Sequence, residues 1–289
     1  MTLFNDKYRL GRRLGKGGHG QVNIATDGKG EMNIAIKQIQ RNKIKNWVLI
    51  NGQRYPREVV IMNEVANIEG SIKLIEFEED QDGLSIAMEY MEPSMDLYEY
   101  ISKKGTLEEE ETRIIFKKII NTLMEYNQKG ISHNDIKDEN ILINPETLEI
   151  RIIDFGCATF TNQREVEKEN GTTLYKPPEM IKEKYGDWEL AQTWSLGILL
   201  IDMLEGNIPF LNEHQICHKE LILKQKVTKP CQELLKQCLN KDPKQRIRMI
   251  DLQSHPWIEN PIKKESTSIC SKIIRYCRRL LRDNHQNQT

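Results

Sequence analysis

One segment decides the fold: His133-Asn134-Asp135-Ile136-Lys137-Asp138-Glu139-Asn140, near the middle of a 289-residue chain. Asp135, Lys137 and Asn140 lie within six residues of one another. One short loop can therefore present a proton acceptor, a cation for a phosphate group and an amide oxygen for a metal ion. Phosphoryl transfer requires these three groups, so the segment predicts a phosphotransferase site.

The residues after this segment predict a β-hairpin. The apolar runs 141–143 and 150–153 flank the turn-forming sequence Asn144-Pro145-Glu146-Thr147. The hairpin would bring Asp154, the first residue of Asp154-Phe155-Gly156, beside Asn140. An Asp-x-Gly sequence after a strand is commonly just a turn. In this position, however, Asp154 is the expected metal carboxylate, because magnesium is usually held by one or two side chains plus phosphate oxygens.

A glycine-rich sequence near the N-terminus predicts a cover for phosphate groups. Gly15-Lys16-Gly17-Gly18-His19-Gly20-Gln21-Val22 lets backbone N–H groups approach phosphate oxygens that side chains would block. Taken alone it is a weak signal, and a plain tight hairpin is the alternative. The stretch continues into strands and not into a helix. This context favours a phosphate-covering hairpin over a dinucleotide-binding fingerprint.

Lys37 ends the apolar strand predicted for residues 33–37. A lysine at a strand end is usually a solvated surface residue. Here its position suits a cation that reaches the α and β phosphates of a nucleotide. Glu58, at the start of a helix predicted over residues 57–68, would hold it by an ion pair. Glu64 is the competing partner, but the apolar run 59–62 makes Glu58 the better choice.

The patterns along the chain predict two lobes of different class. Short β-like runs fill the first forty residues, and further strands are expected at 72–75 and 84–88. Helical repeats then dominate at 96–103, 108–129, 190–205 and 230–240. We expect an α+β, bilobal fold. Its parts are an antiparallel β-rich N-lobe with one main helix (1–88), a hinge (89–95), a larger, mostly α-helical C-lobe (96–260) and a tail (261–289).

Together with the segment Gly171-Thr172-Thr173-Leu174-Tyr175-Lys176-Pro177-Pro178-Glu179, these motifs resemble those of eukaryotic protein kinases over residues 8 to about 260. Within that superfamily the chain is most similar to the PIM-type serine/threonine kinases of the calmodulin-kinase group, through residues 51–60, 135–143 and 194–203. Most kinases have an aspartate where this chain has Gln192. PIM-like kinases also lack that acid, so the departure supports the subfamily.

The resemblance implies ATP and Mg²⁺ as cofactors and gives each motif residue a role. Asp135 would accept the proton of a protein hydroxyl, and Lys137 would steady the transferred phosphoryl group. Asn140 and Asp154 would hold two magnesium ions. Lys37, paired with Glu58, would position the α and β phosphates.

The same resemblance implies an adenine site at the hinge, with the Glu89 carbonyl and the Met91 N–H facing the base and Met88 as gatekeeper. The residues expected to bind the nucleotide are Leu14, Gly15, Gly17, Gly20, Val22, Ala35, Lys37, Glu89, Met91, Asp96 and Leu142.

Protein substrates with basic residues near the acceptor are implied as well. Asp96, Glu99, Asp138 and Glu139 would surround the substrate groove, although a solvated acidic face is the ordinary meaning of surface carboxylates. By similarity to PIM and related kinases, Asp96 and Glu139 are expected to contact arginine or lysine upstream of the acceptor. Lys137 and Thr172 resemble the serine/threonine branch, and Thr172 is expected to contact substrate.

Asn134 replaces the arginine of the family pattern. In kinases controlled by phosphorylation that arginine pairs with a phosphate on the activation segment. A neutral amide cannot do so, which predicts a segment ordered without phosphorylation. A pseudokinase that binds nucleotide or partners is the main rival. A small-molecule phosphotransferase is the second, and the activation segment and an expected Arg246–Glu179 pair argue against it.

Bulk composition describes an ordinary protein. Hydrophobic residues make up 38%, charged residues 29%, and the net charge is −1. No bulk charge indicates nucleic acid binding, no run approaches ~18 apolar residues, and the N-terminus lacks the features of a signal peptide. Six cysteines without a C-x-x-C pair favour a reducing cytoplasmic or nuclear setting. We expect a monomer.

The tail needs a separate hypothesis. From Lys263 onward it carries seven Lys or Arg against two acidic residues, a net charge of +5, around one apolar helical stripe. Such a basic amphipathic helix suits a peripheral membrane contact, a calmodulin-like contact or an acidic partner. Packing back on the kinase body is the alternative.

Overall fold

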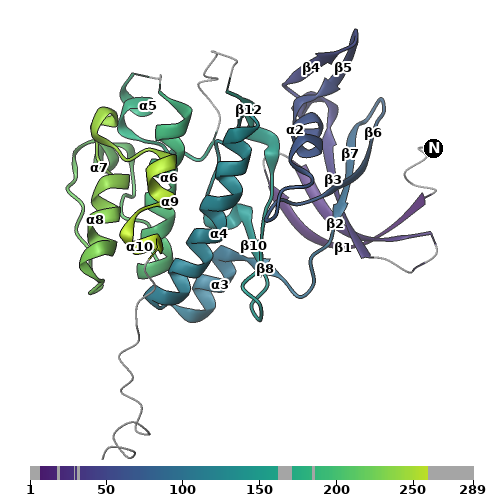
Figure 1. Ribbon diagram of the computed structural model, residues 1–289. Helices are drawn as coiled ribbons and strands as arrows, with labels where there is room; N and C mark the ends of the chain where they lie inside the picture. Colours follow the sequence, from purple (N-terminus) through teal and green to yellow (C-terminus); the bar gives the residue numbers. More distant parts are fainter. Residues whose placement is uncertain are drawn as a thin grey trace, which may run out of the picture. The chain divides into compact units, whose positions relative to one another are not determined.

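The computed structural model describes residues 7–17, 20–28, 30, 33–161, 171–183 and 186–259. The predicted basic tail lies outside the described residues, as do residues 18 and 19 of the glycine-rich sequence. Figure 1 shows strands gathered in the N-terminal part and helices in the C-terminal part. The predicted α+β class is confirmed, with an antiparallel sheet and a helix followed by a mostly helical region.

The N-terminal part is built on a five-stranded antiparallel sheet in the order β1-β2-β3-β7-β6. Its strands are β1 (Tyr8–Gly17), β2 (Gly20–Asp27), β3 (Asn33–Gln40), β6 (Leu74–Glu79) and β7 (Gly83–Glu89). Side chains alternate between the faces of a strand. On β3, Ile34 and Ile36 therefore join a small cluster on one face, while Ala35 and Ile39 join the main core on the other. Lys37 lies on the same face of β3 as Ala35 and Ile39.

A second hairpin, which the sequence patterns did not predict, precedes the helix that carries Glu58. It consists of β4 (Trp47–Ile50) and β5 (Gln53–Pro56), paired antiparallel. Asn51 and Gly52 form the turn with φ of 51° and 82°, and Asn-Gly is the preferred pair for a two-residue turn with positive φ. The hairpin leads directly into α2 (Arg57–Val65), which ends three residues before the predicted boundary.

The C-terminal part contains two long helices and several short ones. The helices are α3 (Leu97–Lys104), α4 (Glu109–Gln128), α5 (Pro178–Lys182), α6 (Trp188–Glu205), α7 (Glu213–His218), α8 (Lys229–Cys238), α9 (Met249–Gln253) and α10 (Pro256–Glu259). The Asp96 carboxylate accepts the Glu99 N–H, so α3 begins one residue after the predicted start. Asp187 caps α6 in the same way, so α6 begins at Trp188, two residues before the predicted start at 190.

Short strands and 3₁₀ turns surround the segment that opened the sequence analysis. The strands are β8 (Met95–Asp96), β9 (Ile131–Ser132), β10 (Ile141–Ile143), β11 (Ile150–Ile152) and β12 (Thr159–Phe160), and the turns are η1 (Arg41–Lys43), η2 (Asp138–Asn140), η3 (Phe155–Cys157), η4 (Thr173–Tyr175) and η5 (Pro243–Gln245). β10 and β11 form the predicted hairpin. The Ile153 N–H donates to the Asn140 carbonyl at 3.0 Å, which places Asp154 next to the catalytic segment.

One buried ion pair joins distant parts of the helical region. The Arg246 guanidinium donates to both Glu179 carboxylate oxygens at 2.6 and 2.9 Å, and its side chain is fully buried. The guanidinium also lies 5.1 Å from the Trp194 ring centre. The predicted Arg246–Glu179 pair is therefore confirmed.

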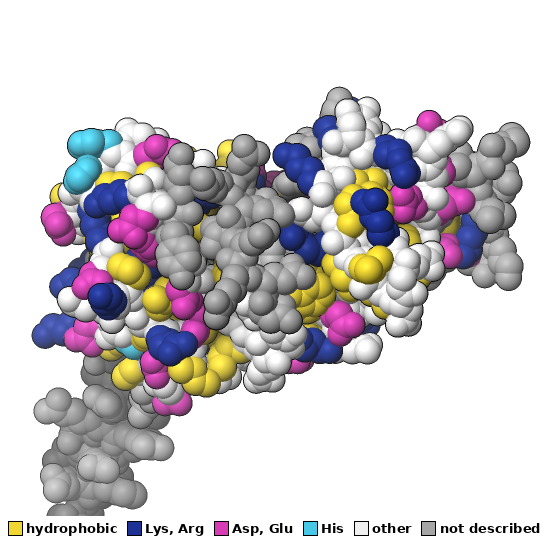
Figure 2. Space-filling model, turned by 90° about the horizontal axis from the view of Figure 1, so that it is seen from above, with side chains coloured by type: hydrophobic (Ala, Val, Ile, Leu, Met, Phe, Trp, Pro, Cys, Tyr) yellow, Lys and Arg dark blue, Asp and Glu magenta, His cyan; other side chains and the backbone are white. Residues whose placement is uncertain are grey.

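The surface carries charges of both signs. Figure 2 shows Lys and Arg side chains interspersed with Asp and Glu over the face it presents. In the part of the chain that the structure describes, no helix combines the length and apolarity needed to cross a membrane.

Candidate active site

A large cavity of about 1150 Å³ collects most of the residues predicted to bind nucleotide or perform chemistry. Those that line it are Leu14, Gly15, Gly20, Val22, Ala35, Lys37, Glu58, Met88, Glu89, Met91, Asp96, Asp135, Lys137, Glu139, Asn140, Leu142, Asp154 and Thr172. Gly17 lies at the end of β1 and pairs with Gly20 of β2. The β1–β2 hairpin and the loop between β9 and β10 thus contribute to the same cavity.

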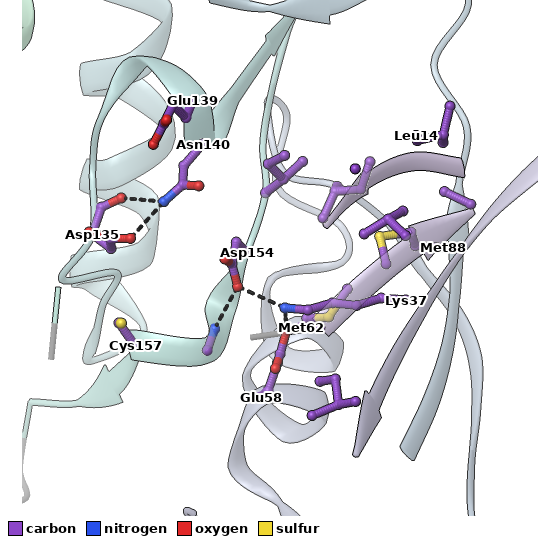
Figure 3. Close-up of a pocket in the computed structure, with 18 of the residues that line it drawn as sticks. Leu14, Lys37, Glu58, Met62, Met88, Asp135, Glu139, Asn140, Asp154 and Cys157 are labelled. Carbon is purple, nitrogen blue, oxygen red and sulfur yellow. Dashed lines mark hydrogen bonds and ion pairs between the residues drawn. The ribbon is translucent and has the colours of Figure 1, made fainter. Parts of the chain in front are cut away.

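Lys37 joins the two parts of the site. Its ammonium group donates to Glu58 Oε1 at 2.6 Å and to Asp154 Oδ1 at 2.7 Å (Figure 3). Burial by itself lowers the pKa of Lys37, but the charges of Glu58 and Asp154 outweigh it and raise the pKa above its ordinary value. The lysine is therefore a permanent cation. Its partner is Glu58, as the sequence predicted, and not Glu64.

Asp135 is held on both carboxylate oxygens. The Asn140 amide donates to its Oδ2 at 2.9 Å and to its backbone carbonyl at 2.8 Å. The Thr172 N–H and hydroxyl donate to its Oδ1 at 2.7 and 2.8 Å. Lys137 Nζ lies 3.9 Å from the Asp135 carboxylate and 2.6 Å from Glu139. The loop therefore fixes a carboxylate and keeps a cation beside it.

Asn140 and Asp154 provide oxygen atoms that suit magnesium. Because the Asn140 Nδ2 is directed to Asp135, its amide oxygen is turned away from that carboxylate (Figure 3). The Asp154 carboxylate enters the same cavity from the end of the β10–β11 hairpin. Carbonyl and carboxylate oxygens are the ligands that magnesium prefers. The donor set fits the metal that the sequence analysis expected.

His133 and Phe155 form an apolar support beneath these groups. His133 is fully buried, its Nε2 lies 3.0 Å from the Ile153 carbonyl, and its ring packs 5.1 Å from Phe155. Burial lowers the pKa of His133, so the imidazole is neutral at neutral pH. Phe155 also contacts Tyr126 of α4 at 5.8 Å. The sequence analysis gave neither side chain a role, although both lie inside motifs it had singled out.

The residues expected to form the hinge begin at the end of β7. Met88 is opposite Ala35 in the β3–β7 ladder, and both line the cavity. The Glu89 side chain accepts the Lys73 N–H at 3.0 Å and pairs with Arg151 of β11, also at 3.0 Å. The backbone at Glu89 is thereby attached to a strand of the C-terminal part.

Three carboxylates, those of Asp96, Glu99 and Glu139, line the cavity, and the buried Asp138 lies near them. Burial raises the pKa of Asp96, and the nearby charges of Glu99, Asp138 and Glu139 raise it further against the opposing effect of its cap hydrogen bond. Asp138 is buried, accepts the Tyr175 hydroxyl at 3.1 Å and interacts with Asp202. Burial and the charge of Asp138 raise the pKa of Asp202. Sequence spacing could not indicate that Asp202 belongs to this group, because it lies 64 positions beyond Asp138.

The fold and the site define a phosphotransferase with two lobes and a cleft between them. The model of the protein kinase domain matches residues 8–258. Among its relatives are serine/threonine-protein kinase prk-2 of Caenorhabditis elegans, 34% identical, and serine/threonine-protein kinase pim-2 of Danio rerio, 32% identical. The alignments cover 90% of this chain and 60% of prk-2, and 88% of this chain and 86% of pim-2. The chain belongs to the protein kinase family.

More distant members show that the likeness is not confined to one branch. NUAK family SNF1-like kinase 1 of Mus musculus is 31% identical over 91% of this chain and 40% of its own length. The predicted membership of the protein kinases is confirmed.

Proposed function

We propose that this protein is an ATP-dependent serine/threonine kinase of the PIM-like type, which acts on hydroxyl groups in basic sequence contexts. One observation carries the proposal: Lys37, Asp135, Asn140 and Asp154 meet in a single cavity, already arranged by hydrogen bonds and ion pairs. The identity to prk-2 and pim-2 supports the choice of subfamily.

Positioning and charge neutralisation do most of the work in this reaction. Asp135 orients the substrate hydroxyl and accepts its proton, while Lys137 neutralises charge on the phosphoryl group in transfer. Lys37 holds the α and β phosphates. Asn140 and Asp154 are the residues that would hold magnesium, which when bound neutralises charge on the phosphates.

The pseudokinase alternative has less support. Its basis is Asn134, which lies beside the catalytic aspartate but is not among the groups expected to touch phosphate or metal. The Lys37–Glu58 pair at 2.6 Å is typical of a kinase domain arranged for catalysis.

Basic substrates are the first specific expectation. We expect transfer of labelled phosphate from ATP to peptides with arginine or lysine before the acceptor, because the carboxylates of Asp96, Glu99 and Glu139 line the cavity. Glu139→Gln should raise KM for the best basic peptide by roughly tenfold, since a hydrogen bond to a charged group is lost. Glu146→Gln, in the exposed turn between β10 and β11, is the matched control and should leave KM unchanged. A preference for acidic or proline-directed peptides in the same library would refute this specificity.

Independence from phosphorylation is the second expectation. Asn134 is neutral and cannot pair with a phosphate, so the purified protein should keep most of its activity after phosphatase treatment. Phosphopeptide mass spectrometry would verify that Thr161, Thr172, Thr173 and Tyr175 are unmodified in the treated sample. Loss of activity on dephosphorylation, restored by rephosphorylation, would contradict the proposal.

A further inference from the structure

Asn134 uses its whole amide group in contacts with its surroundings. Its Nδ2 donates to the Cys157 carbonyl at 3.1 Å and to the Thr159 hydroxyl at 2.9 Å. Its Oδ1 accepts the Ser132 hydroxyl at 2.7 Å. Cys157 follows directly after Asp154-Phe155-Gly156, and Thr159 lies two residues further on. The residue that replaces the family arginine thus holds the chain where it leaves the metal-binding aspartate.

The backbone of Asn134 suits the same role. Its φ is 63°, in the left-handed region where asparagine is strongly enriched among non-glycine residues. This conformation lies next to a short ladder in which Thr159 of β12 pairs with Ser132 of β9, and the Thr161 N–H donates to the Gly130 carbonyl at 2.8 Å. The side chain and the ladder fix the same stretch, residues 157–161.

The other end of the segment meets the next residue of the catalytic loop. The Thr172 N–H and hydroxyl bind the Asp135 carboxylate. Gly171 has φ of 84°, and a Cβ added there would lie 2.4 Å from the Asn134 carbonyl oxygen. A side chain at position 171 would therefore push the backbone away from the loop. Asn134 thus binds Cys157 and Thr159 at one end of the segment, and the adjacent Asp135 binds Thr172 at the other.

We propose that Asn134 is a positioning residue: together with Asp135 it clamps the two described ends of the activation segment, residues 157–161 and 171–172, by hydrogen bonds to the Asn134 amide and to the Asp135 carboxylate, where related kinases use an arginine and a phosphate. This inference rests on the proposed function and adds the device that makes phosphorylation unnecessary. It also ties the position of Asp154, through Cys157 three residues later, to that of Asp135. The position of the proposed metal ligand, Asp154, relative to the proposed proton acceptor, Asp135, is thereby fixed.

Amide hydrogen exchange, followed by NMR in the 289-residue protein, tests the clamp directly. Asn134→Asp keeps the shape of the side chain and the tolerance for positive φ but removes both N–H donors. Exchange at the Thr161 amide should accelerate between about five- and thirtyfold, because each neutral hydrogen bond is worth roughly a factor of five. Asn121→Asp, which changes an asparagine whose Oδ1 accepts from Gln253 at an exposed site, is the matched control and should leave this exchange unaltered.

Two further variants separate the ends of the clamp. Thr159→Val removes one acceptor of the Asn134 amide and should accelerate exchange at Thr161 but not at Thr172. Gly171→Ala should accelerate exchange at Thr172 but not at Thr161. In kinetic assays Asn134→Asp should lower kcat and raise the magnesium concentration needed for half-maximal rate, with the peptide KM unchanged.

Unaltered exchange at Thr161 in Asn134→Asp would overturn the clamp, whatever the activity of that variant. Wild-type protein that shows the expected exchange pattern but phosphorylates no Ser or Thr peptide would instead refute the proposed function. The two ideas can therefore fail separately.

Discussion

Replacing Asp135 by asparagine should lower kcat by about two to four orders of magnitude, the usual contribution of a positioned proton acceptor. The variant keeps the size of the side chain and one oxygen for the Thr172 donors, so the loop should stay folded. What it loses is the basic carboxylate that is proposed to receive the hydroxyl proton. We expect the KM for ATP to change little, because the proposed nucleotide contacts come mainly from β1, β2, β3 and the hinge. Steady-state kinetics with a basic peptide measure both constants.

Asp251→Asn serves as the control for this change. Asp251 is exposed on α9, outside the cavity, and its replacement should leave kcat unaffected. If Asp135→Asn kept more than a tenth of the wild-type kcat, another group would have to accept the proton, and the assignment of Asp135 would be wrong.

Replacing Arg246 by methionine should destabilise the protein by about 3–5 kcal/mol, the range found when one partner of a buried ion pair is removed. The guanidinium makes two hydrogen bonds to Glu179 and two more to the Asn240 and Leu190 carbonyls, at 3.0 and 3.1 Å. Methionine fills much of the volume but leaves the Glu179 charge buried without its partner. Chemical denaturation, followed by tryptophan fluorescence, measures the free energy of unfolding.

Arg248→Met provides the matched comparison within the same short stretch. Arg248 pairs with Glu189 at 2.5 Å, but its side chain is 64% exposed. Exposed pairs contribute at most about 1 kcal/mol. Equal losses of stability in the two variants would show that burial does not set the value of the Arg246–Glu179 pair.

The parts of the site that could be predicted from sequence are those that short periodic patterns fix. Alternation along residues 33–40 is enough to put Lys37 on the side of the main core, and the turn after residue 143 is enough to return Asp154 to Asn140. The first residues of α3 and α6 differ from the predicted starts by one and two residues, because the Asp96 and Asp187 side chains cap these helices. The helical repeat over 96–103 counts Asp96 as the first residue of the helix, whereas its side chain caps the helix from outside.

Other features depend on contacts between residues far apart in the chain. Asp202 interacts with Asp138 because the fold brings α6 to the catalytic loop. No local sequence pattern encodes this contact. The bonds from Asn134 to Cys157 and Thr159 likewise require the β9–β12 ladder. The β4–β5 hairpin is a different kind of miss, since Asn51-Gly52 is a strong local signal that was present in the sequence.

The attachment of Glu89 has a consequence for nucleotide affinity. Its side chain is bonded to Arg151 and to the Lys73 N–H, so two contacts anchor the residue whose carbonyl is expected to face adenine. Binding to an acceptor that is already positioned costs less conformational entropy of the protein than binding that must first order a flexible segment. Weakening the Arg151 contact would therefore reduce nucleotide affinity through entropy, without removing any group that touches the base.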